Sequence, residues 1–530
     1  MTGRGMREGS LVARAVRKAA QTGAHLSGGS AVGRGLAAAG RRMGSVISGS
    51  AVADVVGREG VLSATAGESA CLRLLALLLS RMPKAVGRLA ARHACVREPG
   101  LAARCVAWFA DRLHVWTALF LCAVLLVPHA RWNNLYSTAG VFVLFALLLF
   151  REASQDAVCV KPRHAGGWFL LYMLFQGLAF ATSVYPALSV RFLAFHGTNF
   201  LLVLLLVSCF RSLDELVTLV EVAVCGLSVS ALFGVWQGIR GVPVKAAEVD
   251  TTLNDTGVGR VYGLFDNPNN FAEILILLLP FIAALFFASK GWKRRVFYGL
   301  VALPPLAALL MTQSRSSWGG LLVAMCVFAA FLDWRLIPLA GLAGLIVFPF
   351  LPMYLRQRVL SIFNAADTST SYRTKIWNTM LPVIRDYWWT GLGLGNDTVM
   401  KITARYPLYT PKVPLHCHNI YLQTWVETGI LGLVSLMGFL ANTGKHAVRT
   451  LRRLGTKHGD PHARFLVMAG LSSLCGILVT SLVEYTWYYP RVMLLFWCVA
   501  GLLLAAVSLA GAEVRAEGGL AEGTESGGRA

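Results

Sequence analysis

The sequence predicts an all-α polytopic membrane protein with about 12 transmembrane helices, and its composition is the first reason. Of its 530 residues 56% are hydrophobic and only 14% are charged, and the mean hydropathy is +0.59. Apolar runs such as residues 113–128 and 201–210 are too long and too numerous for the core of a water-soluble domain. These observations exclude a soluble globular enzyme.

Breaks in the apolar sequence give the number of helices. Charged residues and clusters of Pro, Gly and Asn separate the apolar runs, and such clusters are typical of the turns between spans. The divisions predict helices centred near residues 121, 144, 176, 201, 225, 279, 304, 325, 345, 430, 474 and 500. An even number of spans places both ends of the chain on the same side of the membrane.

Basic residues in the short loops predict the orientation. Fifteen Lys and Arg residues lie in the short loops on the side of the termini, against seven in the short loops of the other side, among which the loop 238–268 is counted. The positive-inside rule then makes the termini cytoplasmic. Two outer connections are too long to be simple turns, about 30 residues after the fifth helix and residues 355–418. We expect the functional site to be formed by these two connections on the outer face.

Composition also divides the chain. Residues 1–112 hold 17 Lys and Arg against 6 Asp and Glu and are rich in Gly, Ala and Ser, which predicts a basic, disordered extension. Nucleic-acid binding would be the alternative interpretation of this charge, and we do not expect it. Residues 113–510 form the predicted membrane domain, with the large outer loop at 355–418 inside it, and residues 511–530 form a predicted disordered cytoplasmic tail.

The large outer loop contains two patterns. Residues 372–389 place Ile376, Met380 and Ile384 on one face, which predicts an amphipathic helix lying on the membrane surface. The glycines of residues 391–395 (GLGLG) are similar to a phosphate-binding loop, but no strand precedes them and no helix is predicted directly after them. A flexible turn that allows close backbone packing is the interpretation we favour.

Charge in this loop favours a particular chemistry. A reaction on the outer face has no ATP available, so it needs an activated donor such as a sugar on a polyprenyl diphosphate. The loop carries eight Lys and Arg against three Asp, and no carboxylate cluster resembles a metal site. Guanidinium groups bind phosphates in a planar, bidentate geometry. We therefore expect arginines, without a metal or other cofactor, to stabilise the leaving group.

Two arginines are the candidates for that role. Arg315 lies in MTQSRSSWGG, at the outer end of a predicted helix, where a cation is costly unless something compensates for it. It could bind a diphosphate or serve as an interfacial anchor. Arg373 begins the amphipathic segment, and it could bind the donor, remain solvated or stack on Trp377.

Residues 416–418 (HCH) precede the tenth predicted helix. This triplet lacks the second ligand cluster that a zinc site requires. His418 is the candidate catalytic base, because a histidine is largely neutral at pH 7 and can accept a proton; an ordinary interfacial histidine is the alternative. Four residues are possible supporting groups or replacement bases: His416, Glu273, Glu427 and Asp386.

Five motifs together resemble the O-antigen ligase and O-antigen polymerase family of bacterial membrane glycosyltransferases. They are FDNPNNFAE (265–273), TQSRSSWGG (312–320), YRTKIW (372–377), GLGLGND (391–397) and HNIYLQTWVETGILGL (418–433). The resemblance covers roughly residues 113–510.

This resemblance implies a GT-C-type, metal-independent enzyme that acts on the outer face. The donor would be an undecaprenyl-diphosphate-linked glycan, transferred as a whole, and the acceptor a sugar hydroxyl of lipid A-core or of another glycan. It implies that Arg315 and Arg373 bind the diphosphate and that His418 is the base or orients the acceptor. A polymerase or a protein O-glycosyltransferase would share these motifs, and a 12-span transporter is the alternative from another class.

Overall fold

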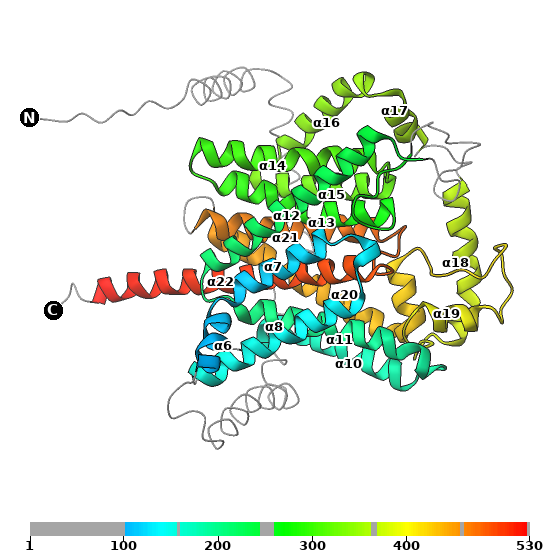
Figure 1. Ribbon diagram of the computed structural model, residues 1–530, viewed down its shortest axis with the longest axis horizontal. Helices are drawn as coiled ribbons and strands as arrows, with labels where there is room; N and C mark the ends of the chain where they lie inside the picture. Colours follow the sequence, from blue (N-terminus) through cyan, green and yellow to red (C-terminus); the bar gives the residue numbers. More distant parts are fainter. Residues whose placement is uncertain (1–100, 156–159, 244–258, 362–367, 456–459, 527–530) are drawn as a thin grey trace, which may run out of the picture. The chain divides into compact units, whose positions relative to one another are not determined.

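The computed structural model describes residues 101–155, 160–243, 259–361, 368–455 and 460–526, and the regular structure in this part of the chain is entirely helical (Figure 1). No β-strand occurs among these residues, so the all-α fold class is confirmed. Residues 1–100, which include most of the predicted basic extension, lie outside the described residues.

The helices follow one another with short connections, except around residues 241–267 and 348–419. Their bounds are α6 Leu101–Asp111, α7 Leu113–Leu126, α8 Asn134–Gln155, α9 Pro162–Ala165, α10 Gly167–Ala181, α11 Pro186–Cys209, α12 Leu213–Arg240, α13 Pro268–Ala288, α14 Trp292–Met311, α15 Arg315–Asp333, α16 Leu336–Val347, α17 Met353–Leu360, α18 Thr368–Asp386, α19 Asn396–Thr403, α20 Ile420–Leu454, α21 Pro461–Thr480 and α22 Pro490–Ser526, with 3-10 helices at His129–Arg131 and Phe348–Phe350.

A helix lies at each of the twelve predicted centres, but the helices differ in length. Nine described helices are long and apolar enough to cross a membrane, and the pair α6 and α7, bent by 72°, is a tenth candidate. The other two predicted spans correspond to shorter apolar helices, α10 and the segment Leu336–Phe350. The chain is therefore a multi-pass membrane protein, with two predicted spans shorter than the roughly 20 residues that a hydrocarbon core requires.

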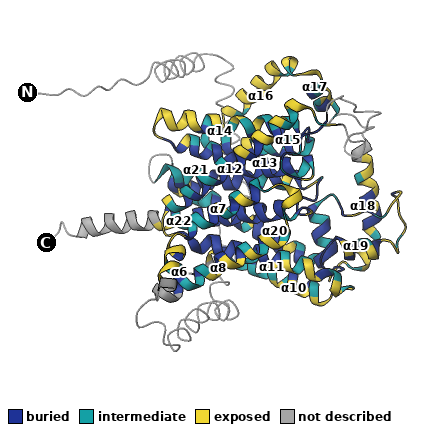
Figure 2. Cartoon of the chain, in the orientation of Figure 1, coloured by how far each residue is buried: buried dark blue, intermediate teal, exposed yellow. Residues whose placement is uncertain are grey.

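The helices separate into a central group and a peripheral group (Figure 2). Helices α13, α21 and α22 are mostly buried, and they pack against one another and against α11 and α12. Helices α14 and α16 expose most of their apolar side chains, as a helix facing lipid does. Helix α22 continues to Ser526, past residue 511, where the sequence predicts a tail without regular structure.

The large outer loop has its own small core. Helix α18 is amphipathic as predicted, but its apolar face, with Ile376 and Met380, packs against Val399 of α19 and against Cys417 and Val426. The expectation that this helix lies with its apolar face on the membrane surface was wrong, because α19 and the start of α20 cover that face. Figure 1 shows α18 and α19 together at one end of the helical bundle.

Three helices define the two ends of the bundle. Each of α13, α14 and α21 has 20 or 21 residues, which corresponds to about 30 Å at 1.5 Å per residue. This length matches the thickness of a bilayer hydrocarbon core. The start of α13 and the ends of α14 and α21 therefore lie at one end of the bundle, and their other termini lie about 30 Å away.

Candidate active site

The turn between α14 and α15 places Arg315 at the first position of a helix. Gln313 in this turn has φ 53, a left-handed conformation that is unusual for a residue other than glycine. Two buried arginines from other segments hold the turn: Arg260 Nε donates to the Thr312 carbonyl at 2.8 Å, and Arg358 Nε donates to the Gln313 carbonyl at 3.1 Å. Strained backbone maintained in this way often marks a functional site.

Arg315 is half-buried, and its Nη1 donates to both the carbonyl and the hydroxyl of Ser361 at 3.1 Å. Arg315 is the first residue of α15, a helix that has no side-chain N-cap. The backbone N–H groups of a helix N-terminus favour the binding of an anion, and so does a guanidinium.

Glu484, in the turn after α21, joins three segments of the chain. Its Oε1 accepts from Arg373 Nη2 of α18 at 2.5 Å and from Asn269 Nδ2 of α13 at 3.4 Å. Its Oε2 lies 3.4 Å from Nδ1 of His418. Asn269 in turn accepts from Arg260 at 2.5 Å, which links this junction to the turn that carries Arg315. We call Asn269, Arg373, His418 and Glu484 the Glu484 cluster.

His418 is held in a defined orientation by the backbone around it. It adopts φ 46, again a left-handed conformation. The neighbouring Cys417 is fixed on both sides: its N–H donates to Gln423 at 2.9 Å, and its carbonyl accepts from Trp377 at 2.9 Å. Asn419 then caps α20 by accepting from two backbone N–H groups at 2.9 Å.

The ring of His418 pairs with Glu484 through Nδ1, and Nε2 makes no hydrogen bond with the described residues. A carboxylate at Nδ1 keeps the proton on that nitrogen and leaves the Nε2 lone pair able to accept another. The side chain of His418 is 31% exposed, whereas that of Glu484 is 9% exposed. His418 can therefore meet a substrate while Glu484 stays behind it.

Burial alone would raise the pKa of the Glu484 carboxyl, but the hydrogen bond with His418 and the charge of Arg373 outweigh it. His416 acts in the same direction, and together these three groups lower the pKa of Glu484 to about 2. Burial, together with the charges of His418 and Arg373, lowers the pKa of His416 to about 3. At neutral pH the cluster therefore contains an ionised Glu484, and His416 next to it is neutral.

The structure gives His416 a supporting position. Its Nδ1 accepts from the backbone N–H of His418 at 3.2 Å, which requires that nitrogen to be unprotonated. Its ring lies 4.8 Å from that of Tyr488 and 5.6 Å from that of Tyr485. His416 is buried and contacts the protein on several sides, so it is less accessible to a substrate than His418.

Glu427 contacts the segment 391–395 (GLGLG), which we call the glycine loop. It accepts from Gln423 at 2.7 Å, and its backbone carbonyl accepts from Gly393 at 3.1 Å. Gly393 has φ 104, and a side chain there would lie 2.0 Å from Ser183. This geometry agrees with a turn that allows close backbone packing. The expectation that no helix follows the glycines was wrong, because α19 begins directly after Gly395.

The other two supporting candidates differ in position. Glu273 is buried one helical turn after Asn269, close to the Glu484 cluster, and its Oε2 has no hydrogen-bond partner among the described residues. Asp386 ends α18, about 20 Å along the helix from Arg373. It is exposed and accepts from Tyr406 at 2.9 Å, so it is not part of the cluster.

Sequence reasoning did not single out Glu484 or Arg260. Glu484 lies 66 residues from His418 and 111 residues from Arg373, so no local spacing connects them. The available signal was an ionisable residue in the outer turn of a span, which is a functional candidate by default. Arg260 carried a similar signal, because it stands in an outer loop directly before the FDNPNNFAE motif.

Comparison with known proteins gives a consistent picture. Residues 300–437 match the family described as O-antigen ligase, and this stretch contains Arg315, Arg373 and His418. The O-antigen ligase of Salmonella typhimurium is 27% identical over 178 residues, which cover 32% of this chain and 44% of that protein.

Two proposed polysaccharide ligases from Rickettsia are also similar. The protein from Rickettsia conorii is 26% identical over 172 residues, covering 30% of this chain and 41% of its own length. The protein from Rickettsia felis is 24% identical over 177 residues, covering 30% of this chain and 42% of its own length. In each case the aligned stretch spans less than half of the relative.

Proposed function

We propose that this chain, which carries an O-antigen ligase family domain at residues 300–437, transfers a glycan from a polyprenyl diphosphate to a sugar hydroxyl. The observation that carries the proposal is the Glu484 cluster, in which one carboxylate contacts both a candidate phosphate-binding arginine and a candidate base. Family membership makes a glycosyltransferase-type enzyme the expected class.

The two arginines would bind the donor. A guanidinium has five N–H donors, so the pairing of Arg373 with Glu484 occupies only part of its capacity. Arg315 adds a second guanidinium at the start of α15, tied to the cluster through Arg260 and Asn269. Two fixed cations near a diphosphate would stabilise the charge that develops on it as it leaves.

His418 would activate the acceptor. Its Nε2 takes the proton from the acceptor hydroxyl, and the hydroxyl oxygen attacks the anomeric carbon of the donor sugar. The bond from that carbon to the diphosphate oxygen breaks, and the diphosphate leaves with its additional negative charge beside the arginines. Glu484 remains ionised and stabilises the imidazolium that forms. A direct attack of this kind inverts the anomeric carbon.

We further propose that the donor is an undecaprenyl-diphosphate-linked glycan and that the acceptor is lipid A-core. The name of the Salmonella typhimurium relative supports ligation of O-antigen. The enzyme would sit in the bacterial inner membrane with its termini in the cytoplasm, and the Glu484 cluster would face the periplasm. The loop charges support this orientation, since the basic short loops lie at the opposite end of the bundle.

The chemistry in this proposal uses no metal. Arginines supply the positive charge, because guanidinium groups bind phosphates without a metal. We predict that a chelator leaves transfer by the purified enzyme intact. Inhibition by EDTA that Mg²⁺ or Mn²⁺ reverses would contradict the metal-independent step.

The functional test is expression in a strain that lacks its own ligase, followed by analysis of lipid A-core for attached polymer. Polymer should appear with the wild-type chain and should be absent with Arg373→Ala. Arg385→Ala is the matched control, because Arg385 lies on the same helix but is 81% exposed and pairs only with the adjacent Asp386 among the described residues. Polymer that remains on the lipid carrier at increased length would indicate a polymerase instead.

A further inference from the structure

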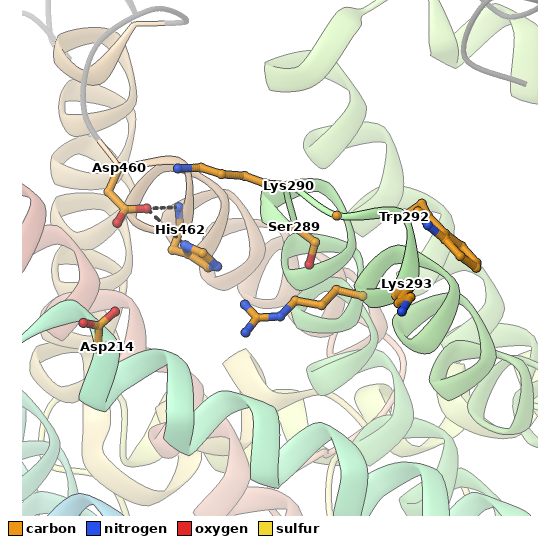
Figure 3. A pocket seen from close by; sticks show the side chains of 9 residues that line it. Asp214, Ser289, Lys290, Trp292, Lys293, Asp460 and His462 are labelled. Atoms are coloured by element: carbon orange, nitrogen blue, oxygen red, sulfur yellow. Dashed lines mark hydrogen bonds and ion pairs between the residues drawn. The ribbon is translucent and has the colours of Figure 1, made fainter. Parts of the chain in front are cut away.

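A cavity lies at the end of the bundle opposite the Glu484 cluster. It has a volume of about 540 Å³ and is formed by the start of α12, the link between α13 and α14, and the start of α21 (Figure 3). This volume falls within the range of roughly 300–1,000 Å³ found for small-molecule sites. Because α13, α14 and α21 each span about 30 Å, the cavity and the Glu484 cluster lie at opposite faces of a bilayer.

Cations outnumber carboxylates in this cavity. Lys290, Lys293 and Arg294 line it, together with Asp214 and Asp460, which leaves a formal charge of +1. Among the described residues none of the three cations forms an ion pair, and all three are exposed. Asp460 is already engaged, since it accepts from the backbone N–H of His462 at 2.7 Å and caps α21. Figure 3 shows Lys290 extending toward Asp460.

The surroundings of the cavity are those of a lipid interface. Trp292, at the start of α14, is among the residues that line the cavity and is 68% exposed, as expected for an aromatic anchor at headgroup depth. Beyond it, Val296, Leu300 and Leu303 follow at helical spacing and are exposed, so they form an apolar strip along α14. If the phosphate of a phospholipid lay in the cavity, the acyl chains of that lipid would extend along this strip.

We propose that this cavity binds the headgroup of an anionic phospholipid, which we call the headgroup site. The phosphodiester would contact Lys290, Lys293 and Arg294, and the first backbone N–H groups of α14, which has no side-chain cap, would add to the binding. Basic pockets between membrane helices bind phospholipid headgroups by the same combination of charge and adjoining apolar surface. The site is independent of the transfer chemistry at the other face.

The test is binding of phosphatidylglycerol to the purified full-length chain in a neutral detergent, measured by native mass spectrometry against phosphatidylcholine. Wild type should prefer phosphatidylglycerol. Lys290→Gln, Lys293→Gln and Arg294→Gln should each weaken this binding roughly fivefold, and the triple variant should weaken it on the order of 100-fold. The matched control replaces Arg335, Arg452 and Arg453, three exposed cations at the same end of the bundle but outside the cavity.

A change in the opposite direction gives a second test. Asp214→Asn removes a negative charge from the cavity and should tighten binding roughly fivefold, whereas Asp333→Asn, on the same face but outside the cavity, should have no such effect. This pair keeps the proposal testable if the triple variant does not fold.

Three results would overturn the proposal. An equal loss of phosphatidylglycerol binding in the triple cavity variant and in the triple control variant would show that binding depends only on the net charge of the protein. Equal binding of phosphatidylglycerol and phosphatidylcholine would exclude an anionic headgroup. Displacement of the lipid by an equal concentration of inorganic phosphate would show a site for a free anion.

Discussion

At the scale of single residues, the account depends on Glu484 as a positioning residue for Arg373 and His418. We predict that Glu484→Gln lowers the kcat for transfer by roughly 10² without raising the KM for the donor. The amide cannot hold the imidazolium that forms on His418, so the rate falls. The substitution Glu484→Gln also removes the negative charge next to Arg373, so binding of the anionic donor does not weaken.

Steady-state kinetics on purified enzyme at equal abundance would measure this split between kcat and KM. Arg373→Ala should behave differently and raise the KM as well as lower the rate. A Glu484→Gln variant that loses donor binding as strongly as Arg373→Ala would show that Glu484 acts only in the structure of the site.

Protonation of Glu484 and His416 should not limit activity near neutral pH. Glu484 has a pKa of about 2 and His416 a pKa of about 3, so neither changes its protonation between about pH 4 and 8. An acidic limb of the rate profile in that range should therefore persist in His416→Gln. An acidic limb that disappears in His416→Gln would show that His416, and not His418, acts as the base.

His416 also gives a prediction about stability. The unfolded chain protonates this histidine below about pH 6.5, whereas the folded protein keeps it neutral down to about pH 3. The unfolded state therefore binds more protons, and the free energy of unfolding falls as the pH drops through this interval, by on the order of 2 kcal/mol at pH 5. His416→Gln should lose less thermal stability between pH 7 and 5 than wild type. An equal loss would mean that His416 is not buried in its neutral form.

At this scale the sequence identified Arg315, Arg373 and His418 as candidates, because each is a chemically suitable side chain at the outer end of a predicted span or in the predicted outer loop. It did not identify Glu484, because the partners of this carboxylate come from α13, α18 and the segment before α20. Such a contact depends on tertiary packing, and a single sequence carries no direct record of it.

At the scale of elements, the glycine loop is predicted to be a packing device. Gly393 has φ 104, and a β-carbon there would lie 2.8 Å from the backbone of Ser183. Gly393→Ala should therefore destabilise the protein by roughly 2 kcal/mol or more, as strained backbone substitutions do. Gly319→Ala is the control, because Gly319 lies within α15 with open space around it.

Thermal unfolding followed by size-exclusion chromatography would compare the two glycine variants. Gly319→Ala should be neutral or slightly stabilising, since alanine favours a helix. A Gly393→Ala variant that is as stable as Gly319→Ala would contradict the packing role and would favour a loop that contacts the substrate instead.

The elements themselves were well predicted where periodicity was strong. The helical face of Ile376, Met380 and Ile384 was correct, but the sequence alone did not show what covers it. Val399 and Ile402 of α19 do so, and α19 was missed because it has only eight residues between a glycine loop and a proline-containing segment. Short helices of this kind are stabilised by packing more than by local propensity.

At the scale of the whole molecule, the central prediction is topology. A cysteine at Lys412, an exposed position in the large outer loop, should react with an impermeant thiol reagent in cells whose outer membrane alone is permeable. A cysteine at Lys293, in the headgroup site, should react only after the inner membrane is opened. Both are compared in a Cys105→Ser background, because Cys105 is exposed. The reverse pattern of labelling would invert the orientation.

The positions of the twelve predicted helices were correct, because long apolar runs mark them directly, but only nine described helices, or ten with the bent α6–α7 pair, are long enough to cross a membrane. The short lengths of α10 and α16 were not predicted. The bend between α6 and α7 is also a tertiary feature. Charge in the loops predicts the orientation without reference to any contact, so labelling can test it independently of the site.

The most direct measurement is transfer in proteoliposomes that contain the purified chain, an undecaprenyl-diphosphate-linked glycan and lipid A-core, with EDTA present throughout. We predict that wild type forms the glycan-bearing lipid A-core and that Arg385→Ala does the same. Arg373→Ala and His418→Ala, at equal abundance, should form at least roughly 10²-fold less. Near-normal transfer by both of these variants, or none by wild type although donor and acceptor bind, would contradict the proposed mechanism.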